Sequence, residues 1–377
     1  MKNANSSLMG KIKRIDPILL ASTSVLSLIS ILTIFGSVEN FGRSKLIMQV
    51  AMTLVGIAFV FLIANLDYSF FVDRFYIVMF VGSVVLLVLT LIFGISGTNI
   101  QTQNRSWIVI PGVGIAIQPS EFVKITFLCG FSKHIDMVKD RISRPKTALG
   151  LLVHAAIIIG LILASGDLGV ALVYIGIVVV MLFCAGLSLW YFLGAIAAVA
   201  IAFPFLWDLL KPYQQARIIF GFQPELDPSG VGMQPLMSRE VISRGGFFGI
   251  GLFEKGMYED LVASHTDFIF AMVCEKFGFL GGALVVVALV TLTARLLYIG
   301  FKCRDTVGKL ICCGCAAVII VQTIENLWMC LAVVPVIGIT LPFVSAGGSS
   351  VLATYMMVGL AHSVSAHEKK FYFRGEV

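Results

Sequence analysis

One carboxylate stands where a long polar segment of the chain gives way to an apolar one. Asp267 follows His265 and Thr266 and is followed by the apolar run 268–270. Partial removal from water at such a boundary can raise the pKa of a carboxylate, and the chemistry that this group then offers is proton transfer. Asp also caps the first turn of helices well. The spacing alone leaves both roles open for Asp267.

Seven further ionisable residues lie within or at the ends of apolar stretches. Each costs about 3 kcal/mol at the centre of a membrane helix and usually faces the interior of a bundle, so these positions are candidates for function. They are Glu121, Lys124, His154, Asp167, Glu275, Lys276 and Glu325. His154 also fits a structural role in the core, and Glu325 and Asn326 could equally be hydrogen-bond partners between helices.

Glu121 and Lys124 follow a helix-start signal. Gln118, Pro119 and Ser120 precede them, and Pro suits the first position of a helix, whose N-terminus can receive an anion. The two charged residues are three positions apart and share one helical face. A structural ion pair explains this pattern as well as a binding site does.

The elements that must position these side chains are membrane helices. Of 377 residues, 58% are hydrophobic and 13% charged, with a mean hydropathy of +0.98, which excludes an ordinary water-soluble protein. A spanning helix needs about 20 apolar residues. We expect an all-α polytopic protein, one integral membrane domain over 1–377 with about ten transmembrane helices. The apolar segments are 17–36, 46–65, 75–95, 119–134, 147–165, 168–186, 188–208, 267–298, 310–334 and 345–366. Gly278, Gly281 and Gly282 indicate a bend or a re-entrant start in the eighth.

The distribution of Lys and Arg predicts the orientation, because these residues are retained on the cytoplasmic side. Most of them, within a net charge of +6, fall on one side of the ten spans, before the first span, in the 133–146 and 302–309 connections, and at 369–374. The opposite short loops hold Arg43, Lys45 and Arg105. Both termini are therefore expected in the cytoplasm. The large loop 209–266, between the seventh and eighth spans, is then extracytoplasmic.

The 209–266 loop exceeds the length of most structureless connections, and its aromatic residues indicate order, so we expect it to fold onto the outer face. None of the eight cysteines lies in an outer loop, where a disulfide would form.

The cysteine group at 312–315 lacks the second ligand pair of a zinc site. No Walker loop or dinucleotide fingerprint is visible, so we expect no nucleotide cofactor, and the charge pattern belongs to a membrane protein rather than a nucleic-acid binder.

Five blocks of the sequence resemble the motifs of one protein family and occur in the same order as in that family. The chain is similar to the SEDS family (shape, elongation, division and sporulation), whose members RodA, FtsW and SpoVE are bacterial cell-wall polymerases. The likeness runs from about Asn104 to Ala366. The blocks are Asn-Arg-Ser-Trp-Ile at 104–108 with Gln-Pro-Ser-Glu-Phe-Val-Lys at 118–124, Gly-Asp-Leu-Gly at 166–169, Asp-Pro-Ser-Gly-Val-Gly-Met-Gln at 227–234 continuing to 251, His-Thr-Asp-Phe-Ile-Phe-Ala at 265–271, and 335–350 with Leu-Pro-Phe-Val-Ser-Ala-Gly-Gly-Ser-Ser at its end.

The chain departs from the family pattern in a few places. Gly-Ala is missing between Asn104 and Arg105, Gly166 stands where Pro is usual, Ala346 stands where Tyr is usual, and the segment before His265 lacks the common Leu-Pro-Glu. These changes leave Asp267 in place. They leave the elongation, division or sporulation branch open.

The resemblance implies a peptidoglycan glycosyltransferase that polymerises lipid II at the outer face of the bacterial cytoplasmic membrane and releases undecaprenyl diphosphate. The 4-hydroxyl of GlcNAc would attack the anomeric carbon of the lipid-linked chain with inversion. A diphosphate leaves without protonation, so one base is enough, unlike the paired carboxylates of glycoside hydrolases. The family's essential Asp matches Asp267, which we therefore expect to be the general base.

The resemblance also implies substrate contacts. For the departing diphosphate the candidates are Arg105, Lys124 and Arg217, with a divalent cation, magnesium or manganese, as an expected companion of the diphosphate. Asp167 could hold a basic residue or a metal, or form a structural salt bridge to Arg105 or Arg217. The remaining candidates for substrate contact or loop ordering are Gln118, Glu121, Gln234, Ser238, Ser349 and Ser350.

Two other functions fit a polytopic protein with buried charge: a lipid II flippase, and a scaffold of the cell-wall synthesis complex that does no chemistry. Members of the family work with a single-span class B penicillin-binding protein, the transpeptidase that cross-links the new strand. We expect the same partner here, in contact with the later spans, where small residues at 314–317 would allow close approach of helices. Membrane lipid is the other expected contact.

Overall fold

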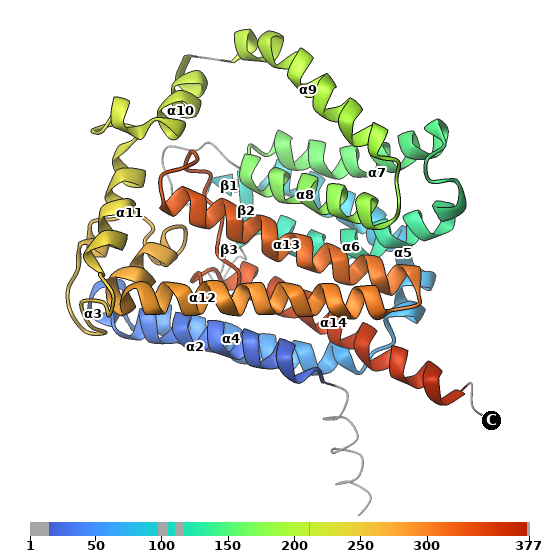
Figure 1. The fold of residues 1–377 in the computed structure, drawn as a ribbon, viewed down its shortest axis with the longest axis horizontal. Helices are drawn as coiled ribbons and strands as arrows, with labels where there is room; N and C mark the ends of the chain where they lie inside the picture. Colours follow the sequence, from blue (N-terminus) through green and yellow to red (C-terminus); the bar gives the residue numbers. More distant parts are fainter. Residues whose placement is uncertain (1–14, 97–104, 110–115, 211, 375–377) are drawn as a thin grey trace, which may run out of the picture.

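The computed structural model describes residues 15–96, 105–109, 116–210 and 212–374. Within these ranges the protein is a bundle of long helices (Figure 1). Asn104 of the first sequence block, and the cations Lys2, Lys11, Lys13 and Arg14 used for the orientation, lie outside the described residues.

Each of the ten predicted spans coincides with a helix. These helices are α2 (Pro17–Phe35), α4 (Arg43–Ala64), α5 (Tyr68–Phe93), α6 (Pro119–Val138), α7 (Pro145–Ala164), α8 (Leu168–Cys184), α9 (Leu189–Leu209), α12 (Ile269–Lys302), α13 (Thr306–Cys330) and α14 (Gly348–Arg374). Six of them, α2, α4, α5, α7, α12 and α13, are long and apolar enough to cross a membrane, and α8 and residues 189–205 of α9 are shorter apolar helices. The expected all-α, multi-pass membrane fold is confirmed.

Several helix ends differ from the predicted spans. Helix α5 begins at Tyr68 instead of 75, because the Asp67 carboxylate accepts a hydrogen bond from the Ser69 N–H and caps the first turn. Helix α14 continues to Arg374, beyond the predicted end at 366. Hydropathy marks only the apolar part of a helix, whereas the helix itself ends where its terminal backbone groups find other partners.

Helix α12 contains the predicted bend. Gly278 has φ 67° and ψ −164°, outside the helical region, so the helix axis breaks there. The N–H groups of Phe279 and Leu280 donate to the carbonyl oxygens of Gly246 and Phe247, at 2.8 and 3.3 Å. The 209–266 segment therefore caps the second part of α12.

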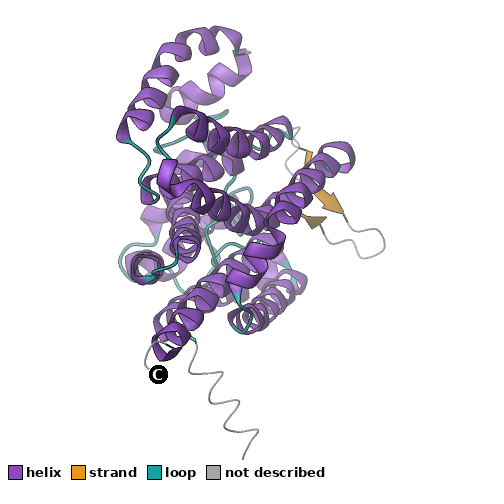
Figure 2. Cartoon of the chain, turned by 90° about the vertical axis from the view of Figure 1, so that its right-hand side faces the viewer, coloured by secondary structure: helices purple, strands orange, loops and turns teal. Residues whose placement is uncertain are grey.

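A small antiparallel sheet is the one departure from the helical expectation within the described residues. Strands β1 (Ile95–Ser96), β2 (Arg105–Val109) and β3 (Ala116–Ile117) lie in the order β1-β2-β3 at one edge of the molecule (Figure 2). The sheet sits between α5 and α6 in the chain and places Arg105 at the start of β2.

The helices pack around α13, which lies against α12, α8 and α6 and is buried along most of its length. Small residues on α13 allow this close packing: a methyl group at Gly314 would meet Leu128 on α6 and Met181 on α8. Helix α14 packs against α4, and α12 also packs against α2. Helix α9 stands away from this bundle (Figure 1).

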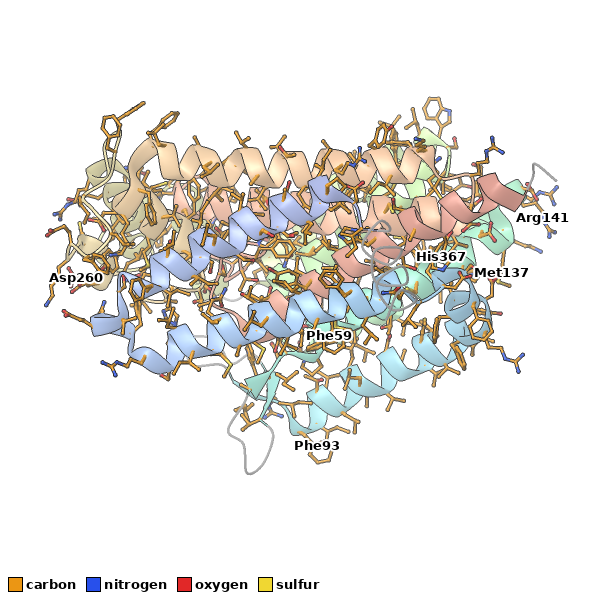
Figure 3. The ribbon with its side chains drawn as sticks, turned by 90° about the horizontal axis from the view of Figure 1, so that it is seen from below. Phe59, Phe93, Met137, Arg141, Asp260 and His367 are labelled. Atoms are coloured by element: carbon orange, nitrogen blue, oxygen red, sulfur yellow. The ribbon has the colours of Figure 1, made fainter. Side chains whose placement is uncertain are left out.

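The 209–266 segment folds into short helices on one end of the bundle. These are α10 (Pro212–Phe222), η2 (Pro224–Leu226), α11 (Met233–Arg244) and η3 (Met257–Glu259); α3 (Val38–Phe41) lies at the same end (Figure 1). Asp260 of this segment and Arg141, in η1 (Lys139–Arg141), lie at opposite ends of the molecule (Figure 3).

Glu275 and Lys276 attach this segment to the bundle. The Glu275 carboxylate accepts the N–H groups of Met257 and Tyr258, both at 2.9 Å. The Lys276 ammonium donates to the carbonyl oxygens of Leu252 at 2.7 Å, Gly36 at 3.2 Å and Glu254 at 3.4 Å. These two charges, candidates for function in the sequence, hold the loop against α2 and α12.

Candidate functional site

Asp267 does not cap helix α12. The N-cap residue is Phe268, and no side chain accepts a hydrogen bond from the first turn of the helix. The carboxylate of Asp267 is therefore not engaged in capping, and the alternative role that its position in the sequence left open is wrong. Its chemistry depends on what surrounds it.

Three consecutive carbonyl groups fix the backbone around Asp267. The carbonyl oxygen of His265 accepts the N–H of Ala346 at 2.9 Å, and that of Thr266 accepts the Ser345 hydroxyl at 2.6 Å. The Asp267 oxygen accepts the amide of Asn326 at 2.7 Å. The loop before α14 and helix α13 thus hold this segment from two sides.

The Asp267 side chain faces the 335–341 loop. A Cβ atom placed on Gly338, which has φ +75°, would lie 3.4 Å from Asp267 Oδ2. Loss of water around the half-buried Asp267 raises the pKa of its carboxyl to about 6, the nearby charge of Asp167 raises it as well, and the Thr266 hydroxyl opposes the change. A carboxyl with this pKa can accept a proton near neutral pH and release it afterwards.

Asp167 lies at the first turn of α8, at the same end of the bundle. It is the N-cap residue: Oδ1 accepts the Val170 N–H at 3.2 Å, and Oδ2 accepts the Gln118 amide at 2.9 Å. Burial raises the pKa of the Asp167 carboxyl, and these two hydrogen bonds oppose that rise. In the described part of the chain, no salt bridge forms between Asp167 and Arg105 or Arg217, so the structural salt bridge that we considered is not present.

Gln118 and the start of α14 complete this group. The Gln118 N–H donates to the Ser349 hydroxyl at 3.3 Å, and the hydroxyl groups of Ser350 and Thr340 are 2.8 Å apart. Gln118, Asp167, Ser349 and Ser350 are thus brought together beside the loop that faces Asp267.

Two cations lie near this group. The Arg105 N–H donates to the Ser165 carbonyl oxygen at 2.9 Å, two residues before Asp167, and the Arg105 side chain is exposed. Lys45, at the start of α4, is also exposed; together with burial, its charge lowers the pKa of the His265 imidazole to about 4. Both could contact an anionic substrate.

Glu121 and Lys124 form a buried ion pair of 2.8 Å, with exposed fractions of 2% and 0%. The ion pair that the sequence allowed is therefore present, and the negative charge of Glu121 balances the positive charge of Lys124. Its partner Glu121 keeps a second oxygen, Oε2, which has no hydrogen-bond partner among the described residues.

The other sequence candidates lie in the 209–266 segment. The Gln234 side-chain oxygen Oε1 accepts the Val262 N–H at 2.9 Å, and the buried Ser238 hydroxyl donates to the Cys330 backbone carbonyl oxygen at 2.9 Å. These contacts order the loop on the bundle. Arg217 is exposed on α10, and the structure does not bring it to Asp267 by any contact that it describes.

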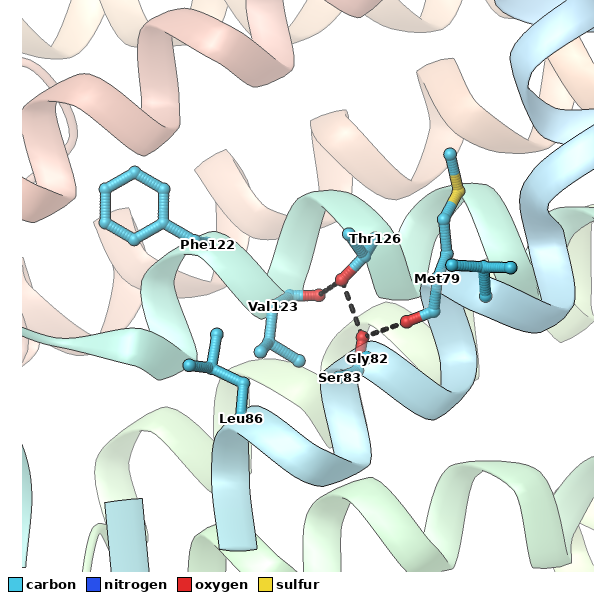
Figure 4. A pocket seen from close by; sticks show the side chains of 8 residues that line it. Met79, Gly82, Ser83, Leu86, Phe122, Val123 and Thr126 are labelled. Carbon is cyan, nitrogen blue, oxygen red and sulfur yellow. Dashed lines mark hydrogen bonds between the residues drawn. The ribbon is translucent and has the colours of Figure 1, made fainter. Parts of the chain in front are cut away.

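Two hollows on the helices lie away from these polar groups. One, of about 310 Å³, is lined by α5 and α6 (Figure 4). The hydroxyls of Ser83 and Thr126 in its wall lie 2.7 Å apart, and they also lie 2.6 and 3.0 Å from the carbonyl oxygens of Met79 and Val123. The other is bordered by Phe203, Pro204, Trp207 and Asp208 of α9. Their walls are mostly apolar, so they offer little for catalysis.

The donor set for a metal is limited. The described residues contain no group of three or more His, Cys, Asp or Glu side chains that could hold a metal ion. Magnesium, however, is commonly bound by one or two carboxylates together with substrate phosphates. The neighbouring carboxylates of Asp167 and Asp267 fit this second arrangement.

Asn326 and Ser345 are the main groups that the sequence did not single out for the site. The sequence predicts Asn326 only as one of two possible hydrogen-bond partners between helices, and it offers Ser345 only as part of the fifth block. Asn326 bonds to a residue 59 positions away in the sequence, and Ser345 to one 79 positions away. A local sequence pattern cannot indicate hydrogen bonds over such separations. Lys45 was used only for the orientation.

The fold and the site define a polytopic membrane protein with a polar site at one end of its bundle, built around a carboxylate of raised pKa. The chain belongs to the FtsW/RodA/SpoVE family: the family model, described as "Cell cycle protein", matches residues 14–370.

Relatives of known name cover most of the chain. It is 34% identical to the probable peptidoglycan glycosyltransferase FtsW of Trichlorobacter lovleyi, over 84% of the chain and 82% of that protein. It is 33% identical to stage V sporulation protein E of Bacillus subtilis, over 85% and 87%. It is 30% identical to the peptidoglycan glycosyltransferase MrdB of Escherichia coli, over 94% of each.

Solved structures share the fold. A chain from a peptidoglycan synthase complex that coordinates polymerization and crosslinking matches with a TM-score of 0.81 and 27% identity, over 94% of this chain and 98% of that one. The rod shape determining protein RodA of Thermus thermophilus matches with a TM-score of 0.69 and 23% identity, over 93% and 96%. The second likeness shows the fold alone.

Proposed function

We propose that this chain, a peptidoglycan glycosyltransferase, polymerises lipid II at the outer face of the cytoplasmic membrane with Asp267 as its general base. The observation that carries the proposal is the state of Asp267: its backbone is fixed by Asn326, its carboxylate does not cap α12, and its pKa is raised to about 6. The family relationship supplies the reaction class.

Asp267 would accept the proton from the GlcNAc 4-hydroxyl as that oxygen attacks the anomeric carbon of the lipid-linked strand. The bond from that carbon to the diphosphate breaks with inversion, and the diphosphate leaves with the electron pair. Positioned base catalysis of this kind contributes about 10²–10⁴-fold. Orientation of the two lipid-anchored sugars and stabilisation of the departing charge supply the rest.

Arg105 is one candidate for stabilising the departing charge, because its backbone is bonded to Ser165, two residues before Asp167. Lys45, whose charge acts on His265, is a second candidate. Lys124 and Arg217 remain proposals for the same task, although Lys124 is already paired with Glu121. A magnesium or manganese ion would be held by Asp167 and Asp267 together with the diphosphate, whose negative charge it would neutralise.

The orientation and the partner are part of the proposal. The large loop and Asp267 would lie outside and both termini inside, as the Lys and Arg distribution indicates. The partner would be a class B penicillin-binding protein, supported by the likeness to a chain of a peptidoglycan synthase complex. That partner would cross-link the strand that this chain makes.

The test is polymerisation of labelled lipid II by the purified full-length protein, alone and with a class B partner, resolved on gels. The comparison includes Asp267→Asn and a matched variant, Asp260→Asn, in which an exposed carboxylate of the same loop is changed. We expect glycan ladders from the wild type and from Asp260→Asn. Asp267→Asn should lose at least about 100-fold in rate while remaining folded, because the carboxylate is not a cap.

Other outcomes would favour other functions. Ladders from a well-folded Asp267→Asn protein would remove Asp267 from the chemistry and shift attention to Asp167. Translocation of lipid II across vesicles without any polymer, in the presence of a competent partner, would indicate a flippase. Neither polymer nor translocation would indicate a scaffold.

A further inference from the structure

A second carboxylate accompanies the buried ion pair of α6. Lys124 Nζ donates to Glu121 Oε1 at 2.8 Å, and the charge of Lys124 also acts on the Glu325 carboxylate of α13, a helix that packs against α6. When both carboxylates are ionised, one negative charge remains without a counter-charge. An unpaired charge among membrane helices is strongly unfavourable, so a further cation or a proton is required there.

The same residues have polar atoms that bind nothing within the protein. Over the ranges that the structure describes, Glu121 Oε2, Glu325 Oε2 and both amide atoms of Gln322 are buried without a hydrogen-bond partner. Gln322 is 1% exposed and lies one turn before Glu325 on the same face of α13. The hydroxyl groups of Ser120 and Thr323 are unpartnered as well. Buried polar groups nearly always have partners.

The chemistry of these atoms identifies the class of ligand. Carboxylate, amide and hydroxyl oxygens are the ligands of hard cations. A monovalent cation balances the remaining negative charge, whereas a divalent one would leave an excess positive charge. Only a few oxygen atoms are at hand, which favours the smaller sodium ion over potassium.

We propose that Glu121, Gln322 and Glu325 form a binding site for one sodium ion between α6 and α13. The site shares no hydrogen bond with the group around Asp267 among the described residues, although the charge of Glu121 is among the causes that raise the pKa of Asp167. Bound sodium would join two helices that carry parts of the outer site, because Gln118 precedes α6 and Asn326 belongs to α13.

The experiment measures the thermal unfolding midpoint of the full-length protein in detergent against sodium concentration, with choline chloride keeping the ionic strength constant. Binding to the folded state alone predicts a rise in the midpoint with added sodium. Glu325→Gln keeps the size of the side chain and removes its charge. We expect the sodium concentration needed for a given rise to increase about tenfold, which corresponds to about 1.4 kcal/mol. Gln322→Met should weaken the dependence in the same direction.

The matched control is Gln49→Met. Gln49 is also a buried glutamine of the bundle, but its amide donates to the Ser30 hydroxyl at 2.9 Å. This variant should lower the midpoint while leaving its sodium dependence unchanged. A wild-type midpoint that is independent of sodium, an equal rise with potassium, or an undiminished sodium dependence in both Glu325→Gln and Gln322→Met would overturn the proposal.

Discussion

The side-chain amide of Asn326 joins the backbone of Asp267 to the loop that faces it. Its nitrogen donates to the carbonyl oxygens of Asp267 and Ile339, both at 2.7 Å, and Asn326 is fully buried. One amide on α13 thus sets the separation between the proposed base and the loop that contains Gly338. Asn326 is therefore a positioning residue for Asp267.

Replacing Asn326 by Leu, which has the same number of side-chain non-hydrogen atoms but no hydrogen-bond donor, should uncouple this arrangement. Two carbonyl groups would lose their donor, and each buried unsatisfied group costs about 1–3 kcal/mol. We expect a lower free energy of unfolding and a fall in the kcat for lipid II polymerisation with a smaller change in KM. The control is Asn65→Leu, because the exposed Asn65 amide donates only to Phe61 of its own helix. Equal kinetics for the two variants would contradict the positioning role.

The pH dependence of polymerisation should report the pKa of Asp267. A general base must be deprotonated, and the carboxyl has a pKa of about 6, so the rate should fall as the pH drops below about 6. The charge of Asp167 raises this pKa. In Asp167→Asn the acidic limb of the profile should therefore move to lower pH, whatever happens to the maximal rate. The measurement is the polymerisation rate across pH 4.5–8 in the same gel assay. An acidic limb that stays in place would show that the charge of Asp167 does not act on Asp267.

Gly278 should tolerate no side chain. Its φ of +67° is unfavourable for other residues, and an added Cβ would overlap the Phe247 carbonyl oxygen. We expect Gly278→Ala to lower the free energy of unfolding by at least about 1–3 kcal/mol. Gly82→Ala on α5 is the matched variant, since no atom lies within 4 Å of its added Cβ. It should be neutral or stabilising by up to about 1 kcal/mol. Equal thermal unfolding midpoints for the two proteins would show that the bend is not required.

Lys276→Met should weaken the attachment of the 209–266 segment to the bundle. Three carbonyl oxygens would lose a charged donor, an interaction typically of about 1.5–3 kcal/mol. If local opening becomes easier by about 1.4 kcal/mol, protease cleavage between 245 and 260 should accelerate about tenfold. Lys255→Met, at an exposed neighbouring position, should leave the rate unchanged. The measurement is the rate of cleavage by protease added outside sealed vesicles in which the orientation of the protein is known. If the wild type and Lys276→Met are equally protected, either Lys276 does not anchor the segment or the proposed orientation is wrong.

The sequence was sufficient for the membrane helices because their signal is local. About 20 consecutive apolar residues define a span whatever it packs against, and the glycines at 278, 281 and 282 indicated the bend in α12. The ends of the helices were less predictable. Asp67 and Asp267 both precede an aromatic residue at a helix start, yet Asp67 caps α5 and Asp267 does not cap α12.

The site was predictable only where a sequence motif exists. Gln118, Asp167, Ser349 and Ser350 were selected from family blocks, and the structure places them in one group. Asn326 could not be selected, because its hydrogen bond to Asp267 arises from the packing of α13 beside the start of α12. Gln234 and Ser238 belong to equally strong motifs, but their contacts order the 209–266 segment. A motif shows which residue type is needed and not which residue it contacts.

The ammonium of Lys276 binds carbonyl groups from two distant parts of the chain, the end of α2 and the loop before η3. Conformational freedom of that loop is therefore lost when the protein folds and not when a substrate arrives. A long, glycine-containing segment would otherwise have to become ordered at each round of strand extension. Under the proposed function, this segment would present an already ordered surface to each lipid-linked donor, so no ordering cost would recur at each cycle.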